Sequence, residues 1–148
     1  MKSRLSNSRQ GKIRTALLRV MDANFNRAKE ALRVCEDISR FFFQSRAVST
    51  ELKTLRHQLT RILLKFPATY REWLEARDSA RDIGKNRWIR DAKKTSFRAV
   101  WISNLKRAQE ALRVMEEFSK VVSPPRCYDF QRMRFALYEL EKKGFRFF

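Results

Sequence analysis

The chain has 148 residues, 43% of them hydrophobic, and its 34 Lys and Arg against 16 Asp and Glu give a formal net charge of +18. That length makes one domain with a real core, and the hydrophobic content, with twelve Phe, excludes a disordered chain. The charge favours anionic partners, whether nucleotides, phosphorylated metabolites or nucleic acid.

Residue types exclude several kinds of site and location. Three glycines leave no glycine-rich nucleotide loop, and the single histidine, His57, cannot make a multi-histidine metal site. Cys35 and Cys127 form no CxxC pair, so we expect reduced thiols. No apolar run approaches the ~18–20 residues of a membrane span, and the N-terminus lacks the apolar core of a signal peptide. We therefore expect a soluble, cytoplasmic protein with no membrane partner.

The first predicted segment, residues 1–10, is a basic flexible tail, because it has no periodic apolar residues. Residues 11–143 predict a single helical domain. Its first helix starts the domain and continues to about Phe43, with apolar residues at helical spacing. A second helix is predicted from its N-cap, Ser49, to Pro67.

Residues 67–95 are predicted to connect the two halves of the domain. They begin with a short helix that carries Tyr70, Trp73 and Leu74 on one side. The connection then continues as a loop whose residues 85–94 are strongly basic.

The last third of the chain predicts two more helices. Residues 96–122 predict a fourth helix with Thr95 or Ser96 as its N-cap. Two prolines separate it from a fifth helix at residues 128–143, and residues 144–148 are a predicted C-terminal tail.

Residues 24–39 and 104–119 form an internal repeat in which ten of sixteen positions are identical. The identical pairs are Asn24/Asn104, Arg27/Arg107, Ala28/Ala108, Glu30/Glu110, Ala31/Ala111, Leu32/Leu112, Arg33/Arg113, Val34/Val114, Glu36/Glu116 and Ser39/Ser119. The helices that follow the two copies also align, so the sequence predicts two duplicated hairpins, at about 17–66 and 96–143. The predicted fold class is an all-α bundle of about five helices with pseudo-two-fold symmetry.

Polar side chains interrupt the apolar arc of both repeats. Asn24 and Arg27 fall inside that arc at 100° per residue, and Asn104 and Arg107 do the same. Burying such groups costs about 1–3 kcal/mol or more unless they find partners. Two interpretations stay open: a structural Arg–Glu network, or a polar cavity that binds an anion such as phosphate.

The two hairpins would bring further arginines toward the same cavity. Arg56, with His57 beside it, and Arg134 lie at the margins of the apolar stripes of the second and fifth helices. Four converging arginines would repel one another unless acids or a bound anion intervene. The internal candidates are Glu30, Glu36, Glu110 and Glu116.

The segment 77–84 holds two carboxylates four residues apart, Asp78 and Asp82, next to Gly84. Carboxylate oxygens are ligands that Mg²⁺ prefers, and Mg²⁺ often shares its shell with substrate phosphates. The alternative interpretation is a helix C-terminus with a solvated turn.

Several of these motifs together resemble a known family. They are Asp22 to Val34, Leu55-Arg56-His57, Ala76-Arg77-Asp78 with Asp82-Ile83-Gly84, and Asn104 to Phe118. The chain is similar over about residues 17–141 to the helical domain fused to the N-terminus of some bacterial thiamine-phosphate synthases. That domain also occurs alone as a monofunctional hydroxymethylpyrimidine phosphate kinase.

The resemblance implies transfer of the ATP γ-phosphoryl group to 4-amino-5-hydroxymethyl-2-methylpyrimidine phosphate, with Mg²⁺ as cofactor, in thiamine biosynthesis. On this hypothesis phosphates would be bound by Arg27, Arg107, Arg56 and Arg134, with His57 nearby. Asp78 and Asp82 would hold Mg²⁺, and Gly84 would let the loop close. Asn24 or Asn104 would contact the aminopyrimidine edge.

The chain departs from the family pattern in two places. After Gly84 the family continues with Thr and an acidic loop, whereas here Lys85 follows and the loop is basic. The second repeat begins with Ser103-Asn104, where Ala-Asn is usual. A specialised or inactive relative therefore remains an alternative. Two other functions also stay open: a basic helical module that binds nucleic acid, and a non-catalytic helical partner of a thiamine-phosphate synthase.

Overall fold

The structure is a computed structural model that describes the backbone of residues 2–84 and 96–148 and the side chains of residues 9–84 and 96–148. Within these ranges the chain is all-α, with five α-helices, one short 3-10 turn and no strand. The elements are α1 (Lys2–Phe41), α2 (Arg46–Leu64), α3 (Tyr70–Ala76), α4 (Phe97–Val122), η1 (Pro124–Arg126) and α5 (Cys127–Phe145). The predicted all-α bundle is confirmed, whereas the basic loop 85–94 and the cap Thr95 lie outside the described residues.

Side-chain caps set the starts of three helices. Ser45 accepts a hydrogen bond from the Val48 amide at α2, and Ser96 accepts one from the Ala99 amide at α4. Thr69 begins α3 with a capping box, in which Glu72 hydrogen-bonds back to the Thr69 amide. Each cap satisfies an amide that the first helical turn leaves without an intrahelical partner.

Three predicted boundaries are wrong. Residues 2–10 continue α1 and are not an irregular tail, since Gly11 costs a helix interior only about 1 kcal/mol. Ser49 lies inside α2, because Ser45 supplies the cap four residues earlier. Gly144 lies inside α5, where it is buried, so the helix continues to Phe145.

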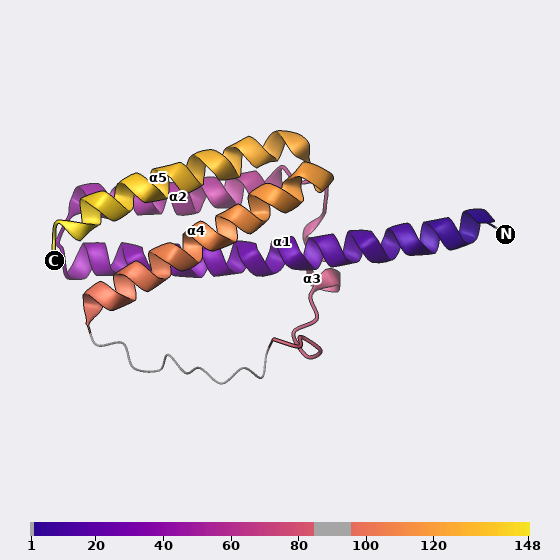
Figure 1. Ribbon diagram of the computed structural model, residues 1–148, viewed down its shortest axis with the longest axis horizontal. Helices are drawn as coiled ribbons and strands as arrows, with labels where there is room; N and C mark the ends of the chain where they lie inside the picture. Colours follow the sequence, from indigo (N-terminus) through magenta and orange to yellow (C-terminus); the bar gives the residue numbers. More distant parts are fainter. Residues whose placement is uncertain (1, 85–95) are drawn as a thin grey trace.

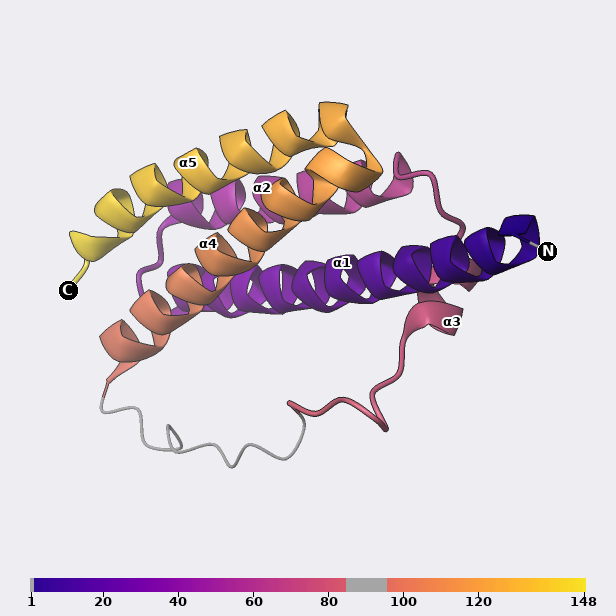
Figure 2. The same cartoon turned by 45° about the vertical axis from the view of Figure 1, so that its right-hand side comes forward.

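The helices form two antiparallel pairs, α1 with α2 and α4 with α5, as Figures 1 and 2 show. In both views α4 crosses α1 obliquely, α2 and α5 lie side by side, and the N-terminal part of α1 extends beyond the bundle. The four long helices enclose one core, whose fully buried side chains include Leu32, Leu59, Trp101 and Leu137. The short α3 packs against α1 and leads into the segment that follows it.

Equivalent residues of the two repeats make matching contacts. The side-chain amide of Asn24 donates to the Val20 carbonyl, and that of Asn104 donates to the Val100 carbonyl, both at 2.9 Å. Ser39 and Ser119 are both fully buried. The duplication and its pseudo-two-fold axis remain predictions from the sequence. In the described part of the chain, no helix has the length and apolar character needed to cross a membrane.

Candidate functional site

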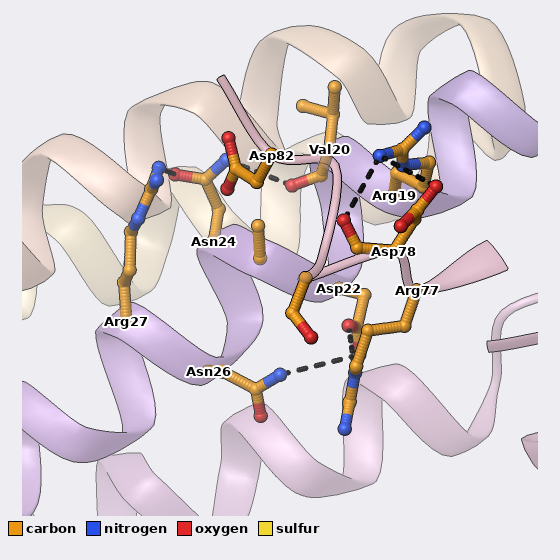
Figure 3. Close-up of a pocket in the computed structure, with 11 residues that line it drawn as sticks. Arg19, Val20, Asp22, Asn24, Asn26, Arg27, Arg77, Asp78 and Asp82 are labelled. Atoms are coloured by element: carbon orange, nitrogen blue, oxygen red, sulfur yellow. Dashed lines mark hydrogen bonds and ion pairs between the residues drawn. The ribbon is translucent and has the colours of Figure 1, made fainter. Parts of the chain in front are cut away.

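A pocket of about 520 Å³, lined mostly by polar and charged residues, lies between α1 and the segment that follows α3 (Figure 3). It is lined by Arg19, Val20, Asp22, Ala23, Asn24, Asn26, Arg27, Arg77, Asp78, Ser79 and Asp82. Three arginines and three aspartates therefore meet in one open cavity. We call it the α1 pocket.

An ion pair between Asp22 and Arg77, both of which line the pocket, joins α1 to the segment after α3. The Arg77 Nε and Nη2 atoms donate to the two Asp22 carboxylate oxygens, both at 2.8 Å. Asp22 is 8% exposed, and its hydrogen bond raises the pKa of Arg77 above its ordinary value. Such a bidentate pair fixes direction as well as distance, so it holds the segment after α3 against α1.

Asp78 lies at the same wall of the pocket, directly after this anchor. The Arg19 Nη2 atom donates to the Asp78 carbonyl at 3.4 Å and lies 3.9 Å from its carboxylate. The Asp78 carboxylate also accepts from the Arg81 amide at 3.1 Å and pairs with the Arg81 guanidinium at 2.9 Å. Because the Arg81 side chain is 88% exposed, this last pair is readily exchanged for another cation.

Arg27 projects into the pocket from α1, supported by Asn24. The Asn24 side chain is almost fully buried, and its oxygen accepts a hydrogen bond from Arg27 Nη1 at 3.4 Å. Arg27 itself is exposed and makes no ion pair with an acid of the described residues. A guanidinium without a carboxylate partner can bind phosphate oxygens in bidentate fashion.

Asp82 completes the lining, and its Oδ1 atom accepts a hydrogen bond from the Gly84 amide at 2.8 Å. No three His, Cys, Asp or Glu of the described ranges gather as a metal site. Mg²⁺, however, is commonly held by one or two carboxylates together with substrate phosphates. Asp78 and Asp82 fit that mode, because both carboxylates line one pocket beside a guanidinium.

The structure brings together only some of the predicted site residues. Asn24, Arg27, Asp78 and Asp82 line the α1 pocket, and Gly84 stands two residues after Asp82. The other predicted residues, Asn104, Arg107, Arg56, Arg134 and His57, do not line it. Arg27 and Arg107 are exposed, contrary to their expected place within the apolar interior, because their long side chains reach past the buried arc to solvent.

Arg56 and Arg134 instead follow the structural interpretation. Arg56 Nε lies 2.9 Å from Glu36, and Arg134 Nη2 lies 2.9 Å from Glu116, so each pair joins the two helices of one hairpin. The Tyr138 hydroxyl, followed by Glu116, raises the pKa of Arg134. The expected convergence of four arginines is therefore wrong for these two, which are neutralised by glutamates.

Sequence reasoning missed Arg19, Asp22, Asn26 and Arg77 as parts of the site. A signal was present on α1, since Arg19, Asp22 and Asn26 recur at spacings of three and four residues and so share one helix face. Arg77 had no such signal, because only the packing of α3 brings it next to Asp22.

Comparison with known proteins covers the whole site. The model of the ThiD2 family matches residues 19–143. Thiamine-phosphate synthase from Synechocystis is 37% identical over 128 residues, which are 86% of this chain and 36% of that protein. The synthase from Nostoc sp. PCC 7120 is 34% identical over 90% of this chain and 37% of its own length, and that from Gloeobacter violaceus is 37% identical over 84% and 35%.

This chain thus spans about a third of the length of these curated relatives. No solved structure matches it. The matched residues include every residue that lines the α1 pocket. The chain belongs to the ThiD2 family, and its relatives link it to thiamine biosynthesis.

Proposed function

We propose that this chain transfers the γ-phosphoryl group of ATP to 4-amino-5-hydroxymethyl-2-methylpyrimidine phosphate, giving the diphosphate and ADP. The observation that supports this function best is the α1 pocket, where the exposed Arg27 guanidinium and the carboxylates of Asp78 and Asp82 line one cavity. Its volume of about 520 Å³ lies within the range of pockets that bind small organic ligands.

The proposed reaction needs positioning and charge compensation more than acid–base chemistry. An oxygen of the substrate phosphate forms a bond to the γ-phosphorus of ATP, the bond from the γ-phosphorus to the β–γ bridging oxygen breaks, and ADP leaves. The attacking oxygen is already ionised at neutral pH, so no proton has to be removed. The barrier arises largely from bringing two anions together, which cations in the pocket would offset.

The residues divide between these tasks. Arg27 binds transferred or attacking phosphate oxygens, and Asn24 orients Arg27 through the hydrogen bond between their side chains. Asn24 is almost fully buried, donates one amide N–H to the Val20 carbonyl and accepts from Arg27, so we assign it to positioning and not to reading the pyrimidine. Asn26, whose amide donates to Asp22 at 3.3 Å and leaves its oxygen free to accept, is a better partner for the exocyclic amine.

Asp78 and Asp82 would hold Mg²⁺ on the phosphates, which would neutralise charge that develops on the β- and γ-oxygens. The Asp22–Arg77 ion pair serves this arrangement indirectly. It holds Arg77, and with it the neighbouring Asp78, against α1, so the width of the pocket is fixed. Arg19 adds a second contact to the same segment.

An ADP-release assay with ATP, Mg²⁺ and the pyrimidine phosphate tests this proposal. We expect Arg27→Ala to lower kcat/KM by about 10²–10³-fold, the usual cost of removing a donor that stabilises transition-state charge. Arg46→Ala removes another exposed arginine, from α2 and outside the pocket, and should retain the wild-type rate. An inactive wild-type chain would refute the kinase function, and a fully active Arg27→Ala would refute the site.

Arg107→Ala tests the remaining part of the sequence hypothesis. Arg107 occupies the position of Arg27 in the second repeat but does not line the α1 pocket. A loss as large as that of Arg27→Ala would extend the site to α4, whereas a small effect would confine it to α1 and the segment after α3.

A second candidate function, a non-catalytic helical partner of a thiamine-phosphate synthase, is supported by a different observation. Proteins named thiamine-phosphate synthase carry a segment similar to this chain within their own polypeptide. Co-purification with a synthase, with no change in melting temperature on adding ATP–Mg²⁺ or pyrimidine phosphate, would favour this function. A ligand-dependent stabilisation that Arg27→Ala abolishes would favour the kinase.

A further inference from the structure

A second cavity of about 520 Å³ lies between α2 and α5, and none of its lining residues belongs to the α1 pocket. We call it the α2–α5 groove. Figures 1 and 2 show the two helices side by side and antiparallel, so the last turns of α2 face the first turns of α5. The proposed kinase reaction gives this cavity no role.

Four cations and one acid line the groove. Arg61 lies in the last turn of α2 and Lys65 is its C-cap, while Arg126 and Arg132 flank Asp129 at the start of α5. Asp129 is shared: its Oδ2 atom lies 3.0 Å from Arg126 Nη1 and its Oδ1 atom 2.6 Å from Arg132 Nη2. One carboxylate is therefore shared by two guanidinium groups. With four cations and one acid, the residues that line the groove have a formal net charge of +3.

Arg61 and Lys65 carry most of this excess. Both are exposed, and neither pairs with an acid among the residues that the structure describes. No side chain caps the first turn of α5, but its positive partial charge is opposed by Asp129 in the same turn and by the carbonyls at the C-terminal end of α2, so the excess charge rests on the side chains. A bound polyanion would offset this concentration of like charge.

The floor of the groove is apolar. Leu55 and Ile62 of α2 and Met133 of α5 line it, and each is less than 10% exposed. Cations above an apolar floor match a ligand that has both a phosphate chain and a flat, largely apolar group. Free phosphate would use only the first of these features.

From this arrangement we propose that the α2–α5 groove binds a nucleoside or heterocyclic diphosphate or triphosphate, at a site separate from the α1 pocket. The phosphates contact Arg61, Lys65 and the start of α5, and the ring system lies on the apolar floor. This inference does not depend on the kinase function.

Titration calorimetry with ADP on the full chain, at about 0.1 M NaCl to suppress non-specific contacts, tests the proposal. We expect the double variant Arg61→Ala/Lys65→Ala to weaken the groove site at least tenfold. The double variant Arg46→Ala/Lys53→Ala is the matched control, because it removes the same charge from exposed positions of the same helix. Equal weakening by both would show a general charge effect and overturn the site.

Two further comparisons make the assignment specific. Wild-type protein should bind ADP more tightly than inorganic pyrophosphate, since only ADP covers the apolar floor; equal affinity would overturn the assigned ligand class. Arg27→Ala should leave the groove site intact whether or not the α1 pocket binds nucleotide. If Arg27→Ala abolishes all ADP binding, or if only RNA binds the groove, the proposal is wrong.

Discussion

At the scale of single residues, the two cysteines should differ sharply in reactivity. Cys35 is fully buried, its Sγ atom lies 3.7 Å from the Trp101 carbonyl, and burial raises the pKa of its thiol far above the ordinary value of 9.0. Only a thiolate reacts readily, so Cys35 should stay inert in the folded protein, while the half-buried Cys127 reacts. Labelling with a chromogenic disulfide should modify one thiol in native protein and two after denaturation.

Single substitutions check this assignment. Cys127→Ser should abolish the labelling of native protein, and Cys35→Ser should leave it. The reverse pattern would show that the core around Cys35 opens easily. The raised pKa also fixes the sign of a pH effect: the unfolded chain loses the Cys35 proton above its ordinary pKa of 9.0 while the folded chain keeps it, so the free energy of unfolding falls as pH rises beyond that point.

The candidate site could be predicted from the sequence only in part. Asn24 and Arg27 were found because polar groups stand out inside the apolar arc of a helix, and Asp78 and Asp82 because they are two carboxylates four residues apart next to a glycine. Arg56 and Arg134 gave the same signal but serve structural ion pairs. The sequence could not separate these cases, because the outcome depends on which glutamate faces each arginine across a hairpin, and Glu36 and Glu116 are distant in sequence from their partners.

At the scale of helices, the packing of α5 on α4 depends on a glycine. A Cβ atom at Gly144 would overlap Trp101 Cζ2 and lie 2.8 Å from Cε2, and the indole is fully buried and cannot move aside. We expect Gly144→Ala to lower the free energy of unfolding by about 1–3 kcal/mol, as overpacked cores do. Chemical denaturation followed by circular dichroism would measure it.

Gly11→Ala is the matched control for that substitution. Gly11 also lies in a helix, but a Cβ atom there would meet nothing within 4 Å. The same chemical change should therefore stabilise the protein, by up to about 1 kcal/mol, through helix propensity alone. Destabilisation by both variants to the same degree would contradict the role of the Trp101 contact.

The equivalent ion pairs of the two hairpins, Arg56–Glu36 and Arg134–Glu116, give a second prediction at this scale. The Arg56 and Arg134 side chains are 17% and 14% exposed, and their glutamate partners are 9% and 5% exposed. Removing either arginine leaves its buried glutamate with a single, half-exposed partner, Arg33 for Glu36 and Arg113 for Glu116. We therefore expect Arg56→Ala and Arg134→Ala each to cost about 1–3 kcal/mol of unfolding free energy. Urea denaturation should show both losses.

Arg71→Ala serves as the reference for these two variants. Its side chain is 86% exposed and pairs with Glu75 within α3, so its loss should cost less than about 0.5 kcal/mol. If only one of Arg56→Ala and Arg134→Ala lowers the free energy of unfolding by more than Arg71→Ala does, the equivalent ion pairs of the two hairpins do not contribute equally to stability.

Helix identities followed from the sequence more reliably than their ends. Apolar periodicity predicted the four long helices and the short α3, because each must bury one face. The end at Gly144 was wrong because glycine is typical both after a helix and where a buried side chain needs room, as Trp101 does here. The predicted tail at residues 1–10 was wrong for a different reason: residues 2–10 belong to α1, and no apolar pattern marks a helical segment that projects from the bundle.

At the scale of the whole molecule, the excess positive charge is not neutralised by the ion pairs of the fold. The bases exceed the acids by eighteen, and both cavities discussed above are lined by arginines. The N-terminal part of α1 extends away from the bundle, with residues 9–16 exposed. Such a surface accelerates encounter with anionic ligands and also repels itself, which destabilises the compact state.

This repulsion predicts that added salt stabilises the fold. Raising NaCl from ~0.02 to ~0.3 M shortens the screening length from about 20 Å to about 6 Å, which weakens repulsion across the whole surface. Exposed ion pairs such as Lys143–Glu51 weaken too, but each contributes at most about 1 kcal/mol. We expect the melting temperature to rise by about 5 °C, measured in NaCl because phosphate and sulfate would also bind the cavities.

A charge-reduced variant separates screening from specific chloride binding. Arg46→Gln/Lys53→Gln lowers the net charge by two at exposed positions that line neither cavity. If repulsion is the cause, this variant melts higher than wild type at low salt and gains less from added NaCl, since part of the repulsion is already gone. A melting temperature that falls with salt would mean that the ion pairs joining α1 to α2 and α4 to α5 stabilise the fold more than the surface repulsion destabilises it. The excess charge would then not need a bound anion to offset it.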